Sequence, residues 1–141
     1  MEKGKNGIIL SKCALIEEYI LKLNGYGPFT EDQISGDWGL QKIIERSLQV
    51  MVEAMIDCAE RICSRNGIGP QTTSADAIRR LKDLGVISGE EPFVSMVRFR
   101  NLIVHNYDSL DTSIMYDIVS KRLDDFRKFT EAVRNYENNQ H

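Results

Sequence analysis

The longest amphipathic segment of the chain runs from about Trp38 to Arg65, and Asp37 just before it is a favourable helix N-cap. Its apolar residues recur at helical spacing and form one stripe: Leu40, Ile44, Leu48, Met51, Met55, Ala59 and Ile62. A second apolar set makes the stripe wider than one neighbouring helix would cover: Ile43, Val50, Ala54 and Cys58. We therefore predict one long helix that is buried on two sides, at the centre of a bundle or at a dimer contact.

Two further helices are predicted around this segment. Apolar residues at helical spacing indicate a first helix from Ile8 to Leu23, ended by the turn residues that follow it. Thr73, followed three residues later by Asp76, is typical of a helix N-terminus, and this short helix should end near Leu84. Gly85 is then well placed as the residue that terminates it.

Two more helices are predicted in the last third of the chain. Ser88 and Glu91 have the S-x-x-E spacing of a capping box, which would open the helix that carries Arg100 and His105. A last long helix should begin near Asp111 and continue to about Tyr136. No internal repeat or strand-like alternation is visible, so we expect an all-α, four- to five-helix up-and-down bundle.

The length and composition bound the number of domains. With 141 residues, 42% of them hydrophobic, the chain suits a single domain spanning residues 1–141. We expect about residues 8–136 to be ordered and the two ends to be frayed.

Charge and cysteine usage restrict the function classes. The formal charge of −3 argues against a protein that coats nucleic acid, although a local basic cleft remains possible. The best candidates for such a cleft are Arg79, Arg80, Lys82 and Arg98, but scattered solubilising charge is the more common explanation. Cys13, Cys58 and Cys63 have neither metal-ligand nor disulfide-scaffold spacing, which predicts reduced core thiols and a cytoplasmic protein.

The sequence predicts no membrane span, no cofactor and no metal site. The apolar runs are much shorter than a bilayer crossing, and no signal peptide is recognisable. Glu53, Asp57 and Glu60 share a helix face, but no histidine is spaced to join them, so we interpret them as a solvated or arginine-pairing face. Trp38 and the methionines are expected to fill the core or an interface.

The stretch from Arg100 to Tyr107 is the only one whose residue types point to chemistry. Arg100 sits in the middle of an apolar helical stripe, and a guanidinium there is costly unless an anion or a carbonyl meets it. Asn101 and His105 share a second face, about 140° away around the helix, together with Arg98. One helix thus presents polar groups in two directions.

These residue types suit metal-independent RNA cleavage. In that reaction the ribose 2′-hydroxyl attacks the adjacent phosphorus, with a base, an acid and a cation assisting. His105 could serve as acid or base, and Arg100 as the cation. One copy offers a single histidine in this stretch, so we expect a two-fold homodimer to complete the site. Alternatively, Arg100 meets a carboxylate such as Glu53 or Asp57 and is structural; the residue spacing alone leaves both open.

The motif Arg100-x4-His105-x-Tyr107 resembles the R-x4-H-x-Y signature of HEPN domains, and in particular that of the HepT toxins. The resemblance extends through most of the chain. It includes Asp37-Trp38, residues 45–49 and residues 53–57, and continues to Phe129. It implies an all-helical, dimeric HEPN fold and an RNase toxin that a minimal nucleotidyltransferase antitoxin, MntA, neutralises.

Carried over residue by residue, the resemblance implies roles for the motif. Arg100 and His105 would be the catalytic pair, Asn101 a polar supporter, and Tyr107 the tyrosine that the antitoxin adenylylates. Asn106 departs from the glycine or histidine that is frequent in the family, and the catalytic pair is intact. The alternative function is a non-catalytic helical module that binds and regulates a nucleotidyltransferase.

Overall fold

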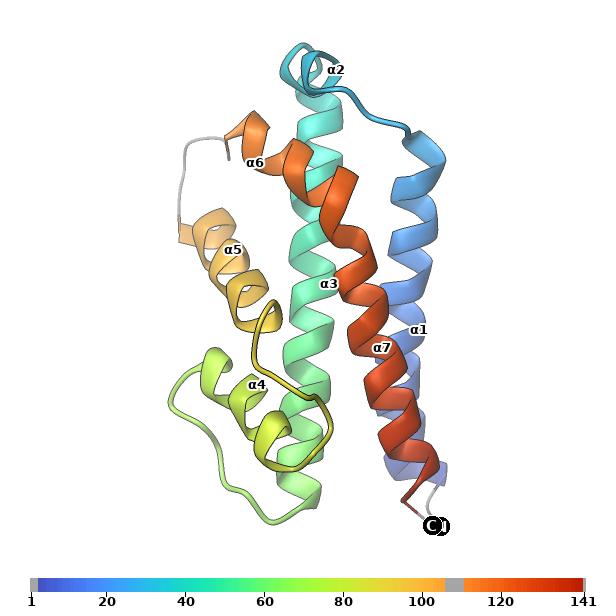
Figure 1. Ribbon diagram of the computed structural model, residues 1–141, viewed down its shortest axis with the longest axis vertical. Coiled ribbons are helices and arrows are strands. Elements are labelled where there is room, and N and C mark those ends of the chain that lie inside the picture. The colour runs from blue at the N-terminus through green and yellow to red at the C-terminus, as the bar shows by residue number, and fades with distance from the viewer. Residues whose placement is uncertain (1–2, 106–110, 141) are drawn as a thin grey trace.

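A computed structural model describes residues 3–105 and 111–140, and the side chains of residues 7–102 and 111–140. Its elements are α1 (Lys3–Tyr26), α2 (Glu31–Ser35), α3 (Trp38–Arg65), α4 (Ser74–Asp83), α5 (Phe93–His105), α6 (Thr112–Asp117), the π-helical segment η1 (Ile118–Arg122) and α7 (Leu123–Asn138). No strand occurs in these ranges, which confirms the predicted all-α class. Figure 1 shows α1, α3 and α7 running along the long axis, with α4 and α5 on the other side of α3.

The central element is α3, as its wide apolar stripe predicted. It contacts α1, α2, α4, α5, α6 and α7. The residues that it buries come from both predicted apolar sets and include Ile44, Met51, Ala54, Met55 and Cys58. Leu40 and Val50 are only half-buried, and Ile43 remains 38% exposed. The prediction of a helix buried on more than one side is therefore confirmed.

Local capping interactions set several helix ends as predicted. The Asp37 carboxylate accepts a hydrogen bond from the Leu40 amide at 3.0 Å at the start of α3. Thr73 Oγ1 accepts one from the Asp76 amide at 3.1 Å at the start of α4. After α4, Gly85 has a φ of +80°, a left-handed conformation in which a side chain would be strained.

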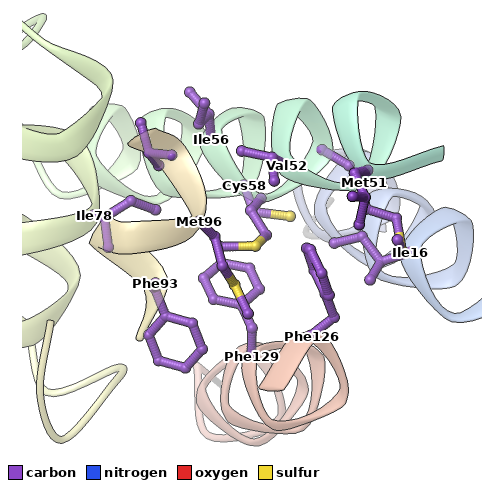
Figure 2. Packing of buried hydrophobic residues seen from close by; sticks show 14 of the residues in the cluster. Ile16, Met51, Val52, Ile56, Cys58, Ile78, Phe93, Met96, Phe126 and Phe129 are labelled. Carbon is purple, nitrogen blue, oxygen red and sulfur yellow. The ribbon is translucent and has the colours of Figure 1, made fainter. Parts of the chain in front are cut away.

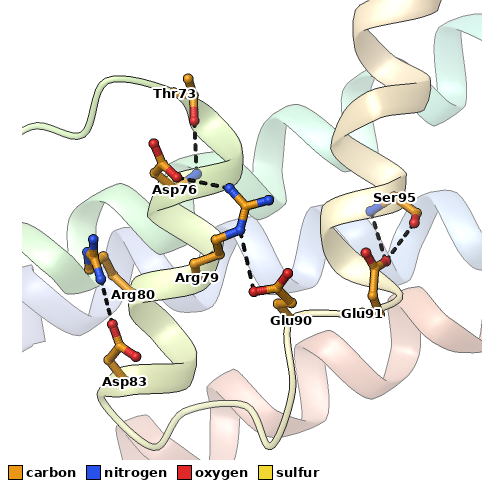
Figure 3. Close-up of polar contacts among 8 residues, drawn as sticks. All are labelled: Thr73, Asp76, Arg79, Arg80, Asp83, Glu90, Glu91 and Ser95. Atoms are coloured by element: carbon orange, nitrogen blue, oxygen red, sulfur yellow. Dashed lines mark hydrogen bonds and ion pairs between the residues drawn. The ribbon is translucent and has the colours of Figure 1, made fainter.

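The predicted Ser88–Glu91 capping box is wrong. The helix begins at Phe93, so Ser88 lies in the connection well ahead of the first turn. The Glu91 carboxylate instead accepts hydrogen bonds from the amide (3.2 Å) and the hydroxyl (2.6 Å) of Ser95 (Figure 3). Glu91 thus satisfies an unpaired amide in the first turn of α5 from outside the helix.

Two elements were not predicted. The short α2 is capped by Thr30, whose side chain forms a reciprocal capping box with Gln33. The last helical region begins where predicted, since Asp111 accepts a hydrogen bond from the Ser113 amide at 2.8 Å. However, it is interrupted by η1, a wider turn of helix, before it continues as α7.

The core lies between α3 and its neighbours. Phe126 and Phe129 of α7 project toward the sulfur-containing side chains Met96 and Cys58 (Figure 2). Phe93 and Phe129 form an edge-to-face pair with ring centroids 5.4 Å apart, a favourable aromatic geometry.

The cysteines and Trp38 test two predictions about side-chain burial. Cys13, Cys58 and Cys63 are all free and buried, as predicted. A hydrogen bond with Cys13 and burial raise the pKa of the Cys58 thiol. Trp38 is 70% exposed, so a core role for it is wrong; Lys42 Nζ lies 5.6 Å from its ring centroid.

Among the helices placed here, none combines the length and apolarity needed to cross a bilayer.

Two ion pairs join α7 to the other long helices. Arg134 of α7 binds Glu17 of α1 through two hydrogen bonds of 2.7 and 3.0 Å. Arg65 of α3 binds Glu137 of α7, whose side chain is buried. The hydrogen bond from Arg134 lowers the pKa of the Glu17 carboxyl below its usual range.

The Glu17–Arg134 pair should make stability depend on pH. Because the folded-state pKa of Glu17 is lowered, its contribution is present above about pH 4.3, the usual value for Glu, and is lost as the pH falls through the folded-state pKa. We expect Glu17→Gln to lower the free energy of unfolding at pH 7 by no more than about 1 kcal/mol, because the pair is partly solvated.

Urea unfolding at pH 7 and at a series of lower pH values, down to the point where the contribution is lost, would measure this effect. The control is Glu18→Gln, since Glu18 lies in the same turn and makes only a long, exposed contact with Lys22. An equal loss in the two variants at pH 7, or a difference that persists at low pH, would contradict the prediction.

Candidate functional site

Arg100 lies on the inward side of α5, where its neighbours one turn back are buried. Phe93, Met96 and Val97 are all core residues, whereas Arg100 itself is half-buried. Its Nη2 donates a hydrogen bond to Ser74 Oγ of α4 at 3.3 Å. Its Nε is buried and has no hydrogen-bond partner among the described residues. A permanent cation is therefore held in place with one weak neutral partner.

The structural explanation for Arg100, an ion pair with Glu53 or Asp57, is wrong. Asp57 pairs with Lys12 at 3.2 Å and with Arg61 at 3.2 Å. Glu53 accepts a hydrogen bond from Gln49 at 3.3 Å. Within residues 7–102 and 111–140, no carboxylate lies at ion-pair distance from Arg100. Among the described side chains, Ser74 is thus the only hydrogen-bond partner of this guanidinium.

Arg100 lines a cavity of about 540 Å³ between α1, α3, α4 and α5, which we call the charged cavity. Its polar wall consists of Lys12, Arg46, Glu53, Asp57, Glu60 and Ser74. The acidic face predicted on α3 therefore lies opposite Arg100. Arg46 is exposed, and no carboxylate in the described part of the chain pairs with it. Sequence reasoning missed Ser74 and Arg46 as site residues, although Arg46 lies in a segment that carries the family resemblance.

On its other side Arg100 lines a second cavity, of about 500 Å³, between α3, α5 and the segment from α6 to α7. We call it the aromatic cavity, because Phe99 and Phe126 form part of its wall. Asp125 Oδ2 and Arg100 Nε, the two buried side-chain atoms without a hydrogen-bond partner in the described ranges, both belong to residues of this wall. No sequence pattern pointed to this cavity, because its walls come from three distant segments.

The candidate basic cleft on α4 is largely neutralised. Arg79 pairs with Asp76 at 2.9 Å and with Glu90 at 3.4 Å, and Arg80 pairs with Asp83 at 2.6 Å (Figure 3). Hydrogen bonds from Thr73 and Arg79 lower the pKa of Asp76, as expected for a carboxylate held by donors. The alternative of scattered solubilising charge accounts for this surface; Lys82 and Arg98, the other two candidates, are exposed.

The remaining motif residues are only partly described. Asn101 is exposed, next to Arg100 on α5. The α5 backbone extends to His105, whose side chain is outside the described set, and Asn106 and Tyr107 lie outside the described residues. The geometry between Arg100 and His105 therefore stays a prediction. Across the described side chains, no three of the types His, Cys, Asp and Glu converge on a point where a metal ion could bind.

The fold and the helix that carries the motif define an all-helical HEPN-type domain. The chain belongs to the family described as ribonuclease HepT-like, whose model matches residues 16–133. A protein named mRNA nuclease HepT, from Shewanella oneidensis, is 30% identical over 132 residues, which cover 92% of this chain and 98% of that protein. A tRNA nuclease HepT from Aphanizomenon flos-aquae is 25% identical, covering 92% of this chain and 89% of the relative.

Solved structures of toxin–antitoxin complexes have the same fold. The tri-AMPylated Shewanella oneidensis HEPN toxin, in complex with the MNT antitoxin, superposes with a TM-score of 0.82 at 30% identity. That match covers 91% of this chain and 97% of the toxin. A toxin–antitoxin structure with AMP-PNP gives a TM-score of 0.83 at 29% identity and covers 92% of this chain and 98% of the other.

Replacing Ser74 should test how firmly Arg100 is held. Ser74→Ala removes the hydroxyl that accepts from Arg100 Nη2, so the half-buried guanidinium loses its hydrogen bond to α4. We expect the free energy of unfolding to fall by about 1 kcal/mol, measured by urea titration. Ser64→Ala, at an exposed serine of α3, should change it by less than about 0.5 kcal/mol. Equal effects of the two substitutions would show that the contact contributes nothing.

Proposed function

We propose that the chain is a cytoplasmic, metal-independent endoribonuclease, the toxin of a toxin–antitoxin pair, in which Arg100 and His105 carry out catalysis. The observation that supports this proposal is the state of Arg100. Its guanidinium is half-buried, faces two cavities and has no carboxylate partner among the described residues. Membership of the ribonuclease HepT-like family supports RNA cleavage as the reaction in which this arginine takes part.

The proposed reaction breaks one P–O bond and forms another. His105 accepts the proton of the ribose 2′-hydroxyl, and the 2′-oxygen attacks the adjacent phosphorus. The 5′-oxygen leaves with a proton from a general acid, so the products are a 2′,3′-cyclic phosphate and a 5′-hydroxyl. Arg100 stabilises the negative charge that builds up on the phosphoryl oxygens. No metal ion enters this sequence of steps.

A homodimer would supply the second proton-transfer group. The motif of one copy contains a single histidine, His105, whereas cleavage needs both a base and an acid. Two motifs related by a two-fold axis would provide two histidines, with the exposed Asn101 beside them as a polar supporter. Arg46 in the charged cavity, which pairs with no carboxylate of the described residues, would help to hold the RNA backbone, since a phosphate favours such a cation.

Removing either catalytic group should abolish most of the cleavage. We expect Arg100→Ala and His105→Ala each to lower the rate on a defined RNA by at least about 100-fold, the usual cost of losing a charge-stabilising group or a general acid–base group. Arg127→Ala is the control, because Arg127 is exposed on α7, pairs with Asp124 and forms no wall of either cavity. It should retain most of the rate.

The same assay separates the two function classes. A wild-type protein that arrests growth and cuts RNA, in contrast to its Arg100→Ala and His105→Ala variants, supports the toxin. A wild-type protein that cuts no RNA in any metal-free buffer, yet binds a minimal nucleotidyltransferase, would support the non-catalytic regulatory module instead.

We further propose that an MntA-like minimal nucleotidyltransferase neutralises the chain by adenylylating Tyr107. The similar Shewanella oneidensis toxin is tri-AMPylated in its complex with an antitoxin. Tyr107 lies in the motif that contains Arg100 and His105, and adenylylation would place a phosphodiester anion there. Such an anion would occupy the arginine and repel the phosphate of the substrate.

A tyrosine without its hydroxyl should escape this control. We expect Tyr107→Phe to stay toxic and to gain no AMP when it is coexpressed with the nucleotidyltransferase, as intact-protein mass spectrometry and growth would show. Tyr116→Phe is the control, since Tyr116 is a half-buried tyrosine of α6 outside the motif. Silencing of Tyr107→Phe as complete as that of the wild type would contradict the proposed modification site.

A further inference from the structure

We propose that the aromatic cavity is a nucleobase subsite that binds one base of the RNA, and that it prefers guanine. This inference rests on the proposed ribonuclease function and names a feature of its substrate. The cavity adjoins Arg100, the proposed catalytic cation, which forms part of its wall. A base bound there would belong to a nucleotide close to the cleaved linkage.

The size and lining of the cavity suit a flat, largely apolar group. Its volume of about 500 Å³ lies in the range of small-molecule sites. Phe99, Met96 and Phe126 supply apolar and aromatic walls, and Pro92 closes one side. Unstacked RNA bases are commonly held by stacking on such side chains.

The charges in the wall favour a neutral base over a phosphate. Three carboxylates, Glu91, Asp117 and Asp125, face two guanidiniums, Arg100 and Arg122. Arg122 is already engaged, lying 3.7 Å from Asp117 and 3.6 Å from Asp125. A phosphate group of the RNA bound in this cavity would therefore meet an excess of negative charge. The N–H donors of a base would instead be attracted to the carboxylates.

Two unsatisfied atoms indicate which hydrogen bonds the ligand supplies. Asp125 Oδ2 accepts no hydrogen bond from the described residues, although Arg122 Nη1 lies 3.6 Å away, and its side chain is only 13% exposed; Arg100 Nε has no acceptor among the same residues. Leaving such groups unpaired is costly, so a ligand that offers both partners is favoured. Guanine presents two adjacent donors, N1–H and N2–H, to a carboxylate, and an acceptor, O6, beside them for a guanidinium. No other RNA base offers a carboxylate that pair of donors together with the acceptor.

Binding of the four nucleoside 5′-monophosphates to the wild-type protein tests the base preference directly. The four share one phosphate and one ribose, so differences in Kd report on the base alone. We expect guanosine monophosphate to bind about tenfold more tightly than the other three, as two charge-assisted hydrogen bonds would give. Four equal dissociation constants, or no binding of any of the four, would overturn the subsite.

Asp125→Asn tests the proposed contact, because it keeps the shape of the side chain and removes the carboxylate. It should reduce the guanine preference to about twofold or less, with an unchanged circular dichroism spectrum. Asp124→Asn is the matched control, since Asp124 is the exposed neighbour, pairs with Arg127 and lies outside the cavity wall. It should keep the preference. A guanine preference that survives in Asp125→Asn would overturn the assignment.

Sequencing of the cleavage products of a random RNA separates this inference from the proposed function. Enrichment of guanine at one position beside the cut, lost in Asp125→Asn and kept in Asp124→Asn, supports the subsite. Cleavage without any base preference would overturn the subsite and leave the ribonuclease intact. Selective binding of guanosine monophosphate by a protein that cuts no RNA would support the cavity and overturn the ribonuclease.

Discussion

The burial of α3 on several sides is the constraint on which the rest of the structure depends. This 28-residue helix contacts six other elements and buries residues along most of its length. Its acidic residues Glu53, Asp57 and Glu60 form part of the wall of the charged cavity. The apolar stripes hold α1 and α7 on one side of α3 and α4 and α5 on the other (Figure 1). The position of α5, and with it Arg100, follows from this packing.

Arg100 is a local conflict within that packing. Continuing the buried side of α5 with an apolar residue would stabilise the bundle, whereas the guanidinium there has a buried Nε without a partner. Core-forming sequences avoid such a group unless function requires it. The two cavities beside it are consistent with that interpretation, because they give a substrate access to the charge from both sides of α5. The catalytic role that we propose for Arg100 would account for this cost.

Helix ends were predicted correctly where the capping interaction joins residues close together in the sequence. Asp37 and Thr73 bond to amides three residues on, so the sequence contains the whole interaction. Ser88 has the same local pattern, but the helix begins later and Glu91 binds Ser95 instead. The π-helical turn from Ile118 to Arg122 has no marker in the apolar spacing of the sequence.

By itself, the sequence determined the helical class, the central helix, the buried thiols and the stretch that carries the family motif, because periodicity, capping and residue type act over a few positions. It also placed Arg100 on an apolar stripe. Only the tertiary structure decided that Asp57 binds Lys12 and Arg61 rather than Arg100, and that Ser74 holds the guanidinium. The same holds for the cavity that joins Arg100 to Asp125. These contacts connect residues far apart in the chain, and which groups meet depends on how the helices pack.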